Sequence, residues 1–205
     1  MQPDYWEQAI NAISVRDPVL KNLIHAYSGS ILNSRGDAFS TLARSIVGQQ
    51  ISVKAAESVW QKLLSHVQIT SPISIHNAEP NALRACGLSS RKVSYLKDLS
   101  RSFMSGELNP EKLVTLEDDL LVVELVKVNG IGRWTAEMFM IFFLMRPNVL
   151  PLDDIGLQRA MSQLYNQKQP LTKQEMRKIA QSWEPWRSVA TWYLWRSLDP
   201  VPVEY

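Results

Sequence analysis

Two adjacent residues with carboxylate side chains, Asp153 and Asp154, are the first candidates for a catalytic role. They follow a short apolar stretch, residues 149–152, and precede a run with helical spacing that begins at Ile155. A carboxylate at such a junction can cap the helix, stabilise a positive charge that develops in a reaction, or orient and deprotonate water. Which role applies depends on the elements that surround the pair.

A Gly-x-Gly turn lies upstream of the acidic pair. Gly130, Ile131 and Gly132 separate two runs of helix-forming residues, 120–128 and 136–145. Glycine can adopt positive φ and has no Cβ to obstruct a close approach, and Ile131 can plug the turn into the packing of the two helices. The first N–H groups of the second helix form an anion site that suits a phosphate. The pattern predicts a helix–hairpin–helix that grips a nucleic-acid backbone without reading its sequence.

The composition limits the kinds of site that the chain can carry. Its 205 residues are 45% apolar and 20% charged, with a net charge of +2, which allows a substantial core and a local basic patch for DNA. Because Cys86 is the only cysteine and His25, His66 and His76 lack ligand spacing, we expect no catalytic metal held by side chains.

The sequence has no secretory pattern at its start and no apolar run of membrane length. We therefore expect no contact with a membrane. We expect a monomer in the compartment that holds DNA, which is the cytoplasm of a bacterium or the nucleus of a eukaryote.

Apolar residues recur at helical spacing along most of the chain, and no useful run alternates as a strand would. The pattern predicts an all-α fold of about ten helices. Residues 71–77 are predicted to be a polar connection. The predicted N-caps are Asp17, Ser52, Ser89 or Ser90, Thr115 and Thr172.

Two polar pairs have alternative interpretations. Gln49 and Gln50 lie at the corner between two predicted helices, where they form either an ordinary polar turn or a flat side chain that enters a DNA base stack. Arg91 and Lys92 lie in the first turn of a helix, where positive charge opposes the helix dipole. They are either a solvated pair or contacts for a partner such as phosphate.

Several segments together resemble the helix–hairpin–helix DNA glycosylases, and most closely the branch of 3-methyladenine DNA glycosylase II. The similarity extends from about residue 15 to residue 198, in the order and spacing of the family. It implies one catalytic domain over residues 1–205, built from two helical subdomains with a cleft between them. The matching segments are 37–39, 46–53, 130–136, 150–154 and 183–188.

The resemblance implies roles for single residues in catalysis and base recognition. Asp154 corresponds to the essential aspartate of the family, which leaves Asp153 as the better candidate for the helix cap. Gln50 corresponds to the wedge that fills the gap left by a flipped nucleotide. Trp195 corresponds to the tryptophan that stacks on the extruded base, and Trp134, beside the hairpin, is the second candidate for the base pocket.

The resemblance also implies how the hairpin contacts DNA. Backbone N–H groups around Gly130, Gly132 and Thr135 would hold a phosphate of the damaged strand. Backbone carbonyls would hold a structural monovalent cation, sodium or potassium, that extends this grip. The carbonyls belong to Val126, Val128 and Ile131. No other cofactor is implied.

The chain departs from the family pattern at four positions. Trp134 stands where relatives that also cut the DNA backbone have a lysine, so no Schiff base can form there and we expect a monofunctional enzyme. Asn129 replaces a proline of many relatives, which should alter the stiffness of the hairpin. Gln50 and Ile155 replace a leucine and an aromatic residue of the best-known bacterial members, which leaves the range of lesions open.

The chemistry of base removal suits these residues. Breaking an N-glycosidic bond builds positive charge on the sugar, and a carboxylate such as Asp154 stabilises that charge in a dry cleft. Purines such as 3-methyladenine and 7-methylguanine are already cationic, and aromatic faces attract cations. We expect a glycosylase that removes alkylated purines from double-stranded DNA and starts base-excision repair. The alternatives are a glycosylase for deaminated or etheno bases, and a non-enzymatic module that binds DNA structure.

Overall fold

The computed structural model describes residues 3–198, which fold into two compact helical units. Within the described residues, unit 1 combines residues 3–34 with residues 145–198, and unit 2 comprises residues 35–144. No strand occurs in residues 3–198, so the all-α prediction is confirmed. None of the helices in this range is both long and apolar enough to cross a membrane.

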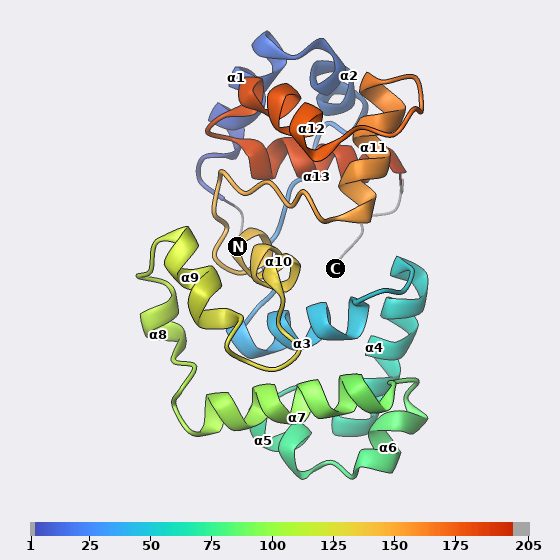
Figure 1. The fold of residues 1–205 in the computed structure, drawn as a ribbon, viewed down its shortest axis with the longest axis vertical. Coiled ribbons are helices and arrows are strands. Elements are labelled where there is room, and N and C mark those ends of the chain that lie inside the picture. The colour runs from blue at the N-terminus through green and yellow to red at the C-terminus, as the bar shows by residue number, and fades with distance from the viewer. Residues whose placement is uncertain (1–2, 199–205) are drawn as a thin grey trace. The chain divides into compact units, whose positions relative to one another are not determined.

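Unit 1 is assembled around its last helix, α13 (Arg187–Leu198), drawn in red in Figure 1. Every residue from Ser188 to Arg196 is buried, as expected for a helix whose apolar residues are not confined to one face. α13 packs against three other helices of the unit, α1, α2 and α11. The other elements of unit 1 are α1 (Trp6–Arg16), α2 (Pro18–Ala26), α11 (Ile155–Tyr165), α12 (Lys173–Ala180) and the 3-10 helix η1 (Gln181–Trp183).

Asp17 links three elements of unit 1. Its Oδ1 accepts hydrogen bonds from the N–H groups of Val19 and Leu20, which makes it the N-cap of α2, as predicted. Its Oδ2 accepts from the Tyr165 hydroxyl and from the Trp183 indole N–H, each at 2.8 Å. Burial, followed by the charge of Asp17, raises the pKa of Tyr165, so the phenol remains a donor. One buried carboxylate therefore joins α2 to α11 and η1.

Unit 2 has α3 (Ala38–Gly48) at its centre, with eight of its eleven residues buried. α3 packs against α4, α7 and α10. Asp37 is the N-cap of α3, and its side chain accepts a hydrogen bond from the Ser40 N–H. The remaining helices are α4 (Val53–Val67), α5 (Pro72–Asn77), α6 (Pro80–Ala85), α7 (Ser90–Met104), α8 (Pro110–Leu113), α9 (Asp118–Leu125) and α10 (Arg133–Phe142).

Two of the predicted boundaries are wrong. Residues 71–77 are not a polar connection, because Ser71 and Ser74 form a capping box that starts α5. This helix buries only Ile75, so its apolar signal is too sparse to detect in the sequence. Thr115 does not cap the next helix; its hydroxyl donates to the Lys112 carbonyl at the end of α8, and α9 begins at Asp118.

The number of helices also exceeds the prediction. Residues 3–198 contain thirteen α-helices and one 3-10 helix, instead of about ten. The additional elements are short, and helices of one or two turns carry too few apolar positions to show a period. The predicted caps at Ser52, Ser89 and Thr172 are confirmed, since each side chain accepts a backbone N–H of its helix.

Candidate functional site

The hairpin turn of unit 2, residues 126–132, joins α9 to α10 and depends on one glycine in particular. Gly130 has φ +91°, a conformation that side chains rarely adopt. A Cβ built there would lie 2.1 Å from Cγ of Tyr95, so the ring of Tyr95 occupies the space that a side chain would need. Ile131 is 5% exposed, which confirms its predicted packing into the helices.

Gly132 differs from Gly130. Its φ is −97°, so the expectation of positive φ is wrong at this position. A Cβ built on Gly132 would meet nothing within 4 Å, which means that the protein itself does not require a glycine here. The open space lies at the N-cap of α10, where an absent Cβ lets a ligand approach the backbone closely.

The N-terminus of α10 has the properties of an anion site. No side chain caps this end of the helix, and the first N–H groups of a helix have no intrahelical acceptors. Thr135 is 1% exposed, and its backbone lies within this first turn. The exposed Arg133 adds positive charge, and its Nε lies 3.1 Å from Oε1 of the buried Glu137. Such an end suits a phosphate.

The two glutamines at the corner between α3 and α4 (residues 49–52) have different surroundings. Gln49 is half-buried, and its Nε2 donates to the Gly130 carbonyl at 2.8 Å and to the Thr135 Oγ1 at 3.0 Å. Gln50 is exposed and has φ +59°, which is uncommon for a residue other than glycine. The polar-turn interpretation therefore applies to Gln49, whereas Gln50 keeps the interpretation of a side chain held outward.

Helix α7 supports both the corner and the hairpin turn. Lys92 Nζ donates to the Val47 carbonyl at 2.7 Å, close to the end of α3. Neither interpretation of Lys92 from the sequence was correct, because this ammonium is bonded within the protein, and burial lowers its pKa. Three residues further along α7, Tyr95 packs against Gly130. After another three, Asp98 accepts from the Asn129 Nδ2 at 2.7 Å.

The acidic pair lies in unit 1, at the start of α11. Asp154 is the N-cap of this helix and is 7% exposed. Its Oδ1 accepts from the Leu157 N–H at 2.6 Å and from the Trp195 Nε1 at 2.7 Å. Asp153 forms an ion pair with Lys173 at the surface. The cap role predicted for Asp153 is therefore wrong, because helix boundaries read from sequence are uncertain by a residue or two.

Gly156 is a residue of this site that the sequence analysis missed. A Cβ built on it would lie 3.0 Å from Asp154 Oδ1 and 3.3 Å from Trp195 Cδ1. The absent side chain thus lets the carboxylate and the indole meet. The available signal was a glycine in the first turn of a helix, two residues after Asp154, at a position where glycine is a poor helix former.

The remaining tryptophans of unit 1 have structural surroundings. Trp183 is fully buried and bonded to Asp17, and Trp192 packs edge-on against Trp6 at 5.2 Å between ring centroids. Trp186 stacks on Tyr5. Trp195 is itself only 4% exposed, with its indole N–H directed to Asp154. In unit 2, Trp134 is half-buried in the first turn of α10.

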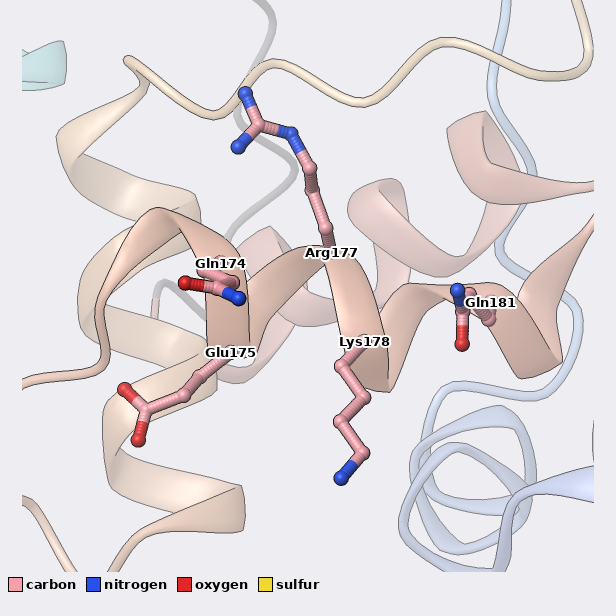
Figure 2. A pocket seen from close by; sticks show the side chains of 5 residues that line it. All are labelled: Gln174, Glu175, Arg177, Lys178 and Gln181. Atoms are coloured by element: carbon pink, nitrogen blue, oxygen red, sulfur yellow. The ribbon is translucent and has the colours of Figure 1, made fainter.

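A hollow on the surface of α12 and the start of η1 is a poor candidate for a base site. Figure 2 shows its five lining residues, with the side chains of Arg177 and Lys178 pointing to opposite sides of the helix. The lining has no aromatic residue, and its charges do not converge on one point. The lining residues are Gln174, Glu175, Arg177, Lys178 and Gln181.

The predicted site residues thus form two groups. Unit 1 brings Asp154 and Trp195 into direct contact. Unit 2 joins the hairpin turn to the corner that carries Gln50. A sequence model of the HhH-GPD superfamily of base excision DNA repair proteins matches residues 43–185, which is more than half of the chain. The chain belongs to this superfamily.

Relatives within the superfamily agree with the resemblance to 3-methyladenine DNA glycosylases. DNA-3-methyladenine glycosylase 1 of Schizosaccharomyces pombe is 31% identical over 87% of this chain and 80% of its own length. DNA-3-methyladenine glycosylase of Bacillus subtilis is 30% identical, and the alignment covers 89% of this chain but only 64% of the relative.

Solved structures of superfamily members have the same fold. The S. pombe 3-methyladenine DNA glycosylase, in complex with abasic DNA, matches with a TM-score of 0.84 and 30% identity over 93% of this chain and 96% of that one. The DNA-3-methyladenine glycosidase of Bacillus halodurans matches with a TM-score of 0.76 and 32% identity, over 96% and 92% of the two chains.

The two glycines of the hairpin turn should respond differently to substitution by alanine. Gly130→Ala should lower the free energy of unfolding by about 2–4 kcal/mol, because it adds strain at positive φ and displaces the Tyr95 ring. Gly132→Ala should change it by less than about 0.5 kcal/mol, because the added methyl group enters open space. Urea denaturation measures both values, and equal losses would contradict the geometry of the turn.

Proposed function

We propose that this protein is a monomeric, monofunctional DNA glycosylase that hydrolyses the N-glycosidic bond of alkylated purines, such as 3-methyladenine and 7-methylguanine. It would start base-excision repair in the compartment that holds DNA. The observation that carries the proposal is the buried carboxylate of Asp154, held by Leu157 and Trp195, in a chain similar to 3-methyladenine DNA glycosylases.

We assign the grip on the damaged strand to unit 2. The N-terminus of α10, around Gly132 and Thr135, would bind one phosphate through backbone N–H groups. The glycosidic bond of a stacked base is inaccessible, so the nucleotide must rotate out of the duplex at a cost of a few kcal/mol. Gln50, exposed at the corner between α3 and α4, would offset part of this cost by filling the vacated space.

We assign the chemistry to unit 1. As the bond from C1′ to the base nitrogen breaks, its electron pair leaves with the base and the sugar becomes positively charged. A carboxylate that is 7% exposed stabilises this charge better than one in water, because the surrounding dielectric is lower. Water then adds to C1′ and loses a proton, which Asp154 can accept. A cationic methylated base needs no prior protonation to leave.

Aromatic side chains would supply the preference for cationic bases. A ring face attracts a cation by roughly 0.5–2 kcal/mol. The indole N–H of Trp195 is bonded to Asp154, so this residue would contact the base through its ring. Trp134, in the first turn of α10, is the second residue that we propose for base recognition.

One observation supports a wider range of lesions as a second candidate. Ile155 follows Asp154 directly and is 77% exposed. An aliphatic side chain offers a base apolar contact without the attraction that an aromatic face has for positive charge. Deaminated or etheno bases would then also be removed. Chromatography of the bases released from damaged DNA, with identification by mass, distinguishes the two ranges.

Asp154→Asn should lower the rate of base release from methylated DNA by at least about 100-fold, because the negative charge that stabilises the sugar cation is lost. The asparagine side-chain oxygen can still accept from Leu157 and Trp195, so folding and DNA binding should persist. Asp153→Asn is the matched control, since Asp153 only pairs with Lys173 at the surface, and it should retain activity. Full activity in Asp154→Asn would refute the mechanism.

The proposal that the enzyme does not cut the DNA backbone rests on Trp134, because an indole cannot form a Schiff base with the sugar. Incubation with methylated DNA and borohydride should therefore give no covalent protein–DNA adduct, and the abasic product should remain uncut. A glycosylase with lyase activity serves as the positive control. A trapped adduct would contradict the proposal.

The hairpin carbonyls fit a monovalent cation. Val126, Val128 and Ile131 lie at or beyond the C-terminal end of α9, where the helix dipole is negative. The Val128 carbonyl accepts from the Ile131 N–H at 3.0 Å and retains a second lone pair. We propose that sodium or potassium binds these three carbonyls and a DNA phosphate, and that no other cofactor is required.

Replacing sodium and potassium by tetramethylammonium at constant ionic strength should weaken DNA binding severalfold, because the organic cation is too large to bind the turn. Fluorescence anisotropy of labelled DNA measures the affinity. Equal affinities with all three cations would show that the hairpin turn needs no bound metal ion.

A further inference from the structure

One glutamine side chain connects the parts of unit 2 that we assign to DNA binding. The amide nitrogen of Gln49 donates to the carbonyl of Gly130 in the hairpin turn and to the hydroxyl oxygen of Thr135 in the first turn of α10. At 2.8 and 3.0 Å, both are hydrogen bonds of ordinary length. Gln49 itself ends α3, so one amide joins three elements.

The backbone next to Gln49 is constrained as well. Lys92 holds the Val47 carbonyl before it. After it, Gln50 takes φ +59°, and Ser52 caps α4. A non-glycine residue keeps such a conformation only where its surroundings impose it. The anchored side chain of Gln49 therefore lies directly before a residue whose backbone conformation is itself constrained.

We propose that Gln49 is a positioning residue that couples phosphate binding at the hairpin to insertion of Gln50 into the duplex. This inference rests on the proposed function, because it takes Gln50 as the inserted side chain. A phosphate bound at the α10 N-terminus orders the backbone that carries Gly130 and Thr135. Through the Gln49 amide, the corner between α3 and α4 is ordered with it. Phosphate binding at the hairpin and insertion of Gln50 into the duplex then occur together.

The chemistry of the contact explains why an amide is needed. Both partners of the Gln49 nitrogen are oxygen atoms, so the contact requires two N–H donors on one atom, which a primary amide provides. A glutamate at this position would present only acceptors. Gln49→Met keeps a similar side-chain length without any donor, and Gln49→Ala removes the side chain altogether.

The test is a double-mutant cycle on DNA binding. The variants are Gln49→Met, Gln50→Ala and their combination, with a duplex that contains a stable abasic-site analogue. In the wild-type background, Gln50→Ala should weaken binding about tenfold. In the Gln49→Met background the same change should weaken it less than about twofold, because contacting residues couple. Additive effects would overturn the proposal, as would a Gln50→Ala variant that binds like the wild type.

A spectroscopic readout separates coupling from a loss of folding. The fluorescence of 2-aminopurine beside the lesion rises when the base unstacks. This fluorescence should be lower with Gln49→Met and with Gln50→Ala than with the wild type, and equally low with both variants. The melting temperature of each free protein should stay within a few degrees of the wild type. Gln49→Ala replaces Gln49→Met in the cycle if the latter does not fold. A wild-type signal in a folded Gln49 variant would refute the coupling.

A surface glutamine provides the matched control. Gln61 is exposed on α4, and its side-chain nitrogen donates only within that helix, to Glu57. Gln61→Ala should therefore leave binding and fluorescence unchanged. The cycle measures binding and not base release. If the cycle shows no coupling but the wild-type protein releases bases, only this inference is overturned. If the cycle shows coupling but the wild-type protein releases no base, only the proposed activity is overturned.

Discussion

The bond between the Trp195 indole and the Asp154 carboxylate is the interaction on which the site in unit 1 depends. It joins the first turn of α11 to the buried helix α13, and it sets the orientation of the only acidic side chain that we assign to chemistry. The Leu157 N–H fixes the same oxygen from the helix side. Gly156 makes the arrangement sterically feasible, since any side chain there would press on both partners.

A second helix-capping aspartate in unit 1 also accepts a hydrogen bond from a tryptophan. Asp17 also caps a helix and also accepts an indole N–H, from Trp183. It accepts from the Tyr165 hydroxyl as well, so its two oxygens serve four donors and join three elements. The pair of Asp17 and Trp183 stabilises the fold, whereas we assign the pair of Asp154 and Trp195 to catalysis. A helix N-terminus holds a buried carboxylate well in either role, because the dipole favours negative charge.

The structural features that depend only on residues close together in the chain were predictable from the sequence. The caps at Asp17, Ser52 and Thr172 were predictable because a cap needs only one polar side chain before a helical run. The Gly-x-Gly turn was recognisable for a similar reason. The choice of Asp154 as the catalytic candidate came instead from the resemblance to a family. The short helix α5 escaped detection because it buries a single apolar side chain.

Contacts between distant residues were not predictable. Lys92 lies 45 positions from the carbonyl that it meets, and Gln49 lies 81 positions from Gly130. The sequence shows only that Lys92 lies in the first turn of a helix and Gln49 at a corner between two helices, and their partners follow from tertiary packing. Gly156 carried only a weak signal, because a glycine in a first turn has several explanations until the neighbouring indole is seen.

Asn129 shows how one hairpin can be stiffened in two ways. A proline would restrict the backbone permanently, in the unfolded chain as well as in the folded one. Asn129 instead depends on a hydrogen bond to the charged side chain of Asp98 at the protein surface, and Asp98 also pairs with Arg101. Such a bond is weakened by competing ions and can open as the temperature rises. The rigidity of this turn is therefore adjustable by salt and heat, whereas that of a proline-containing turn is constant.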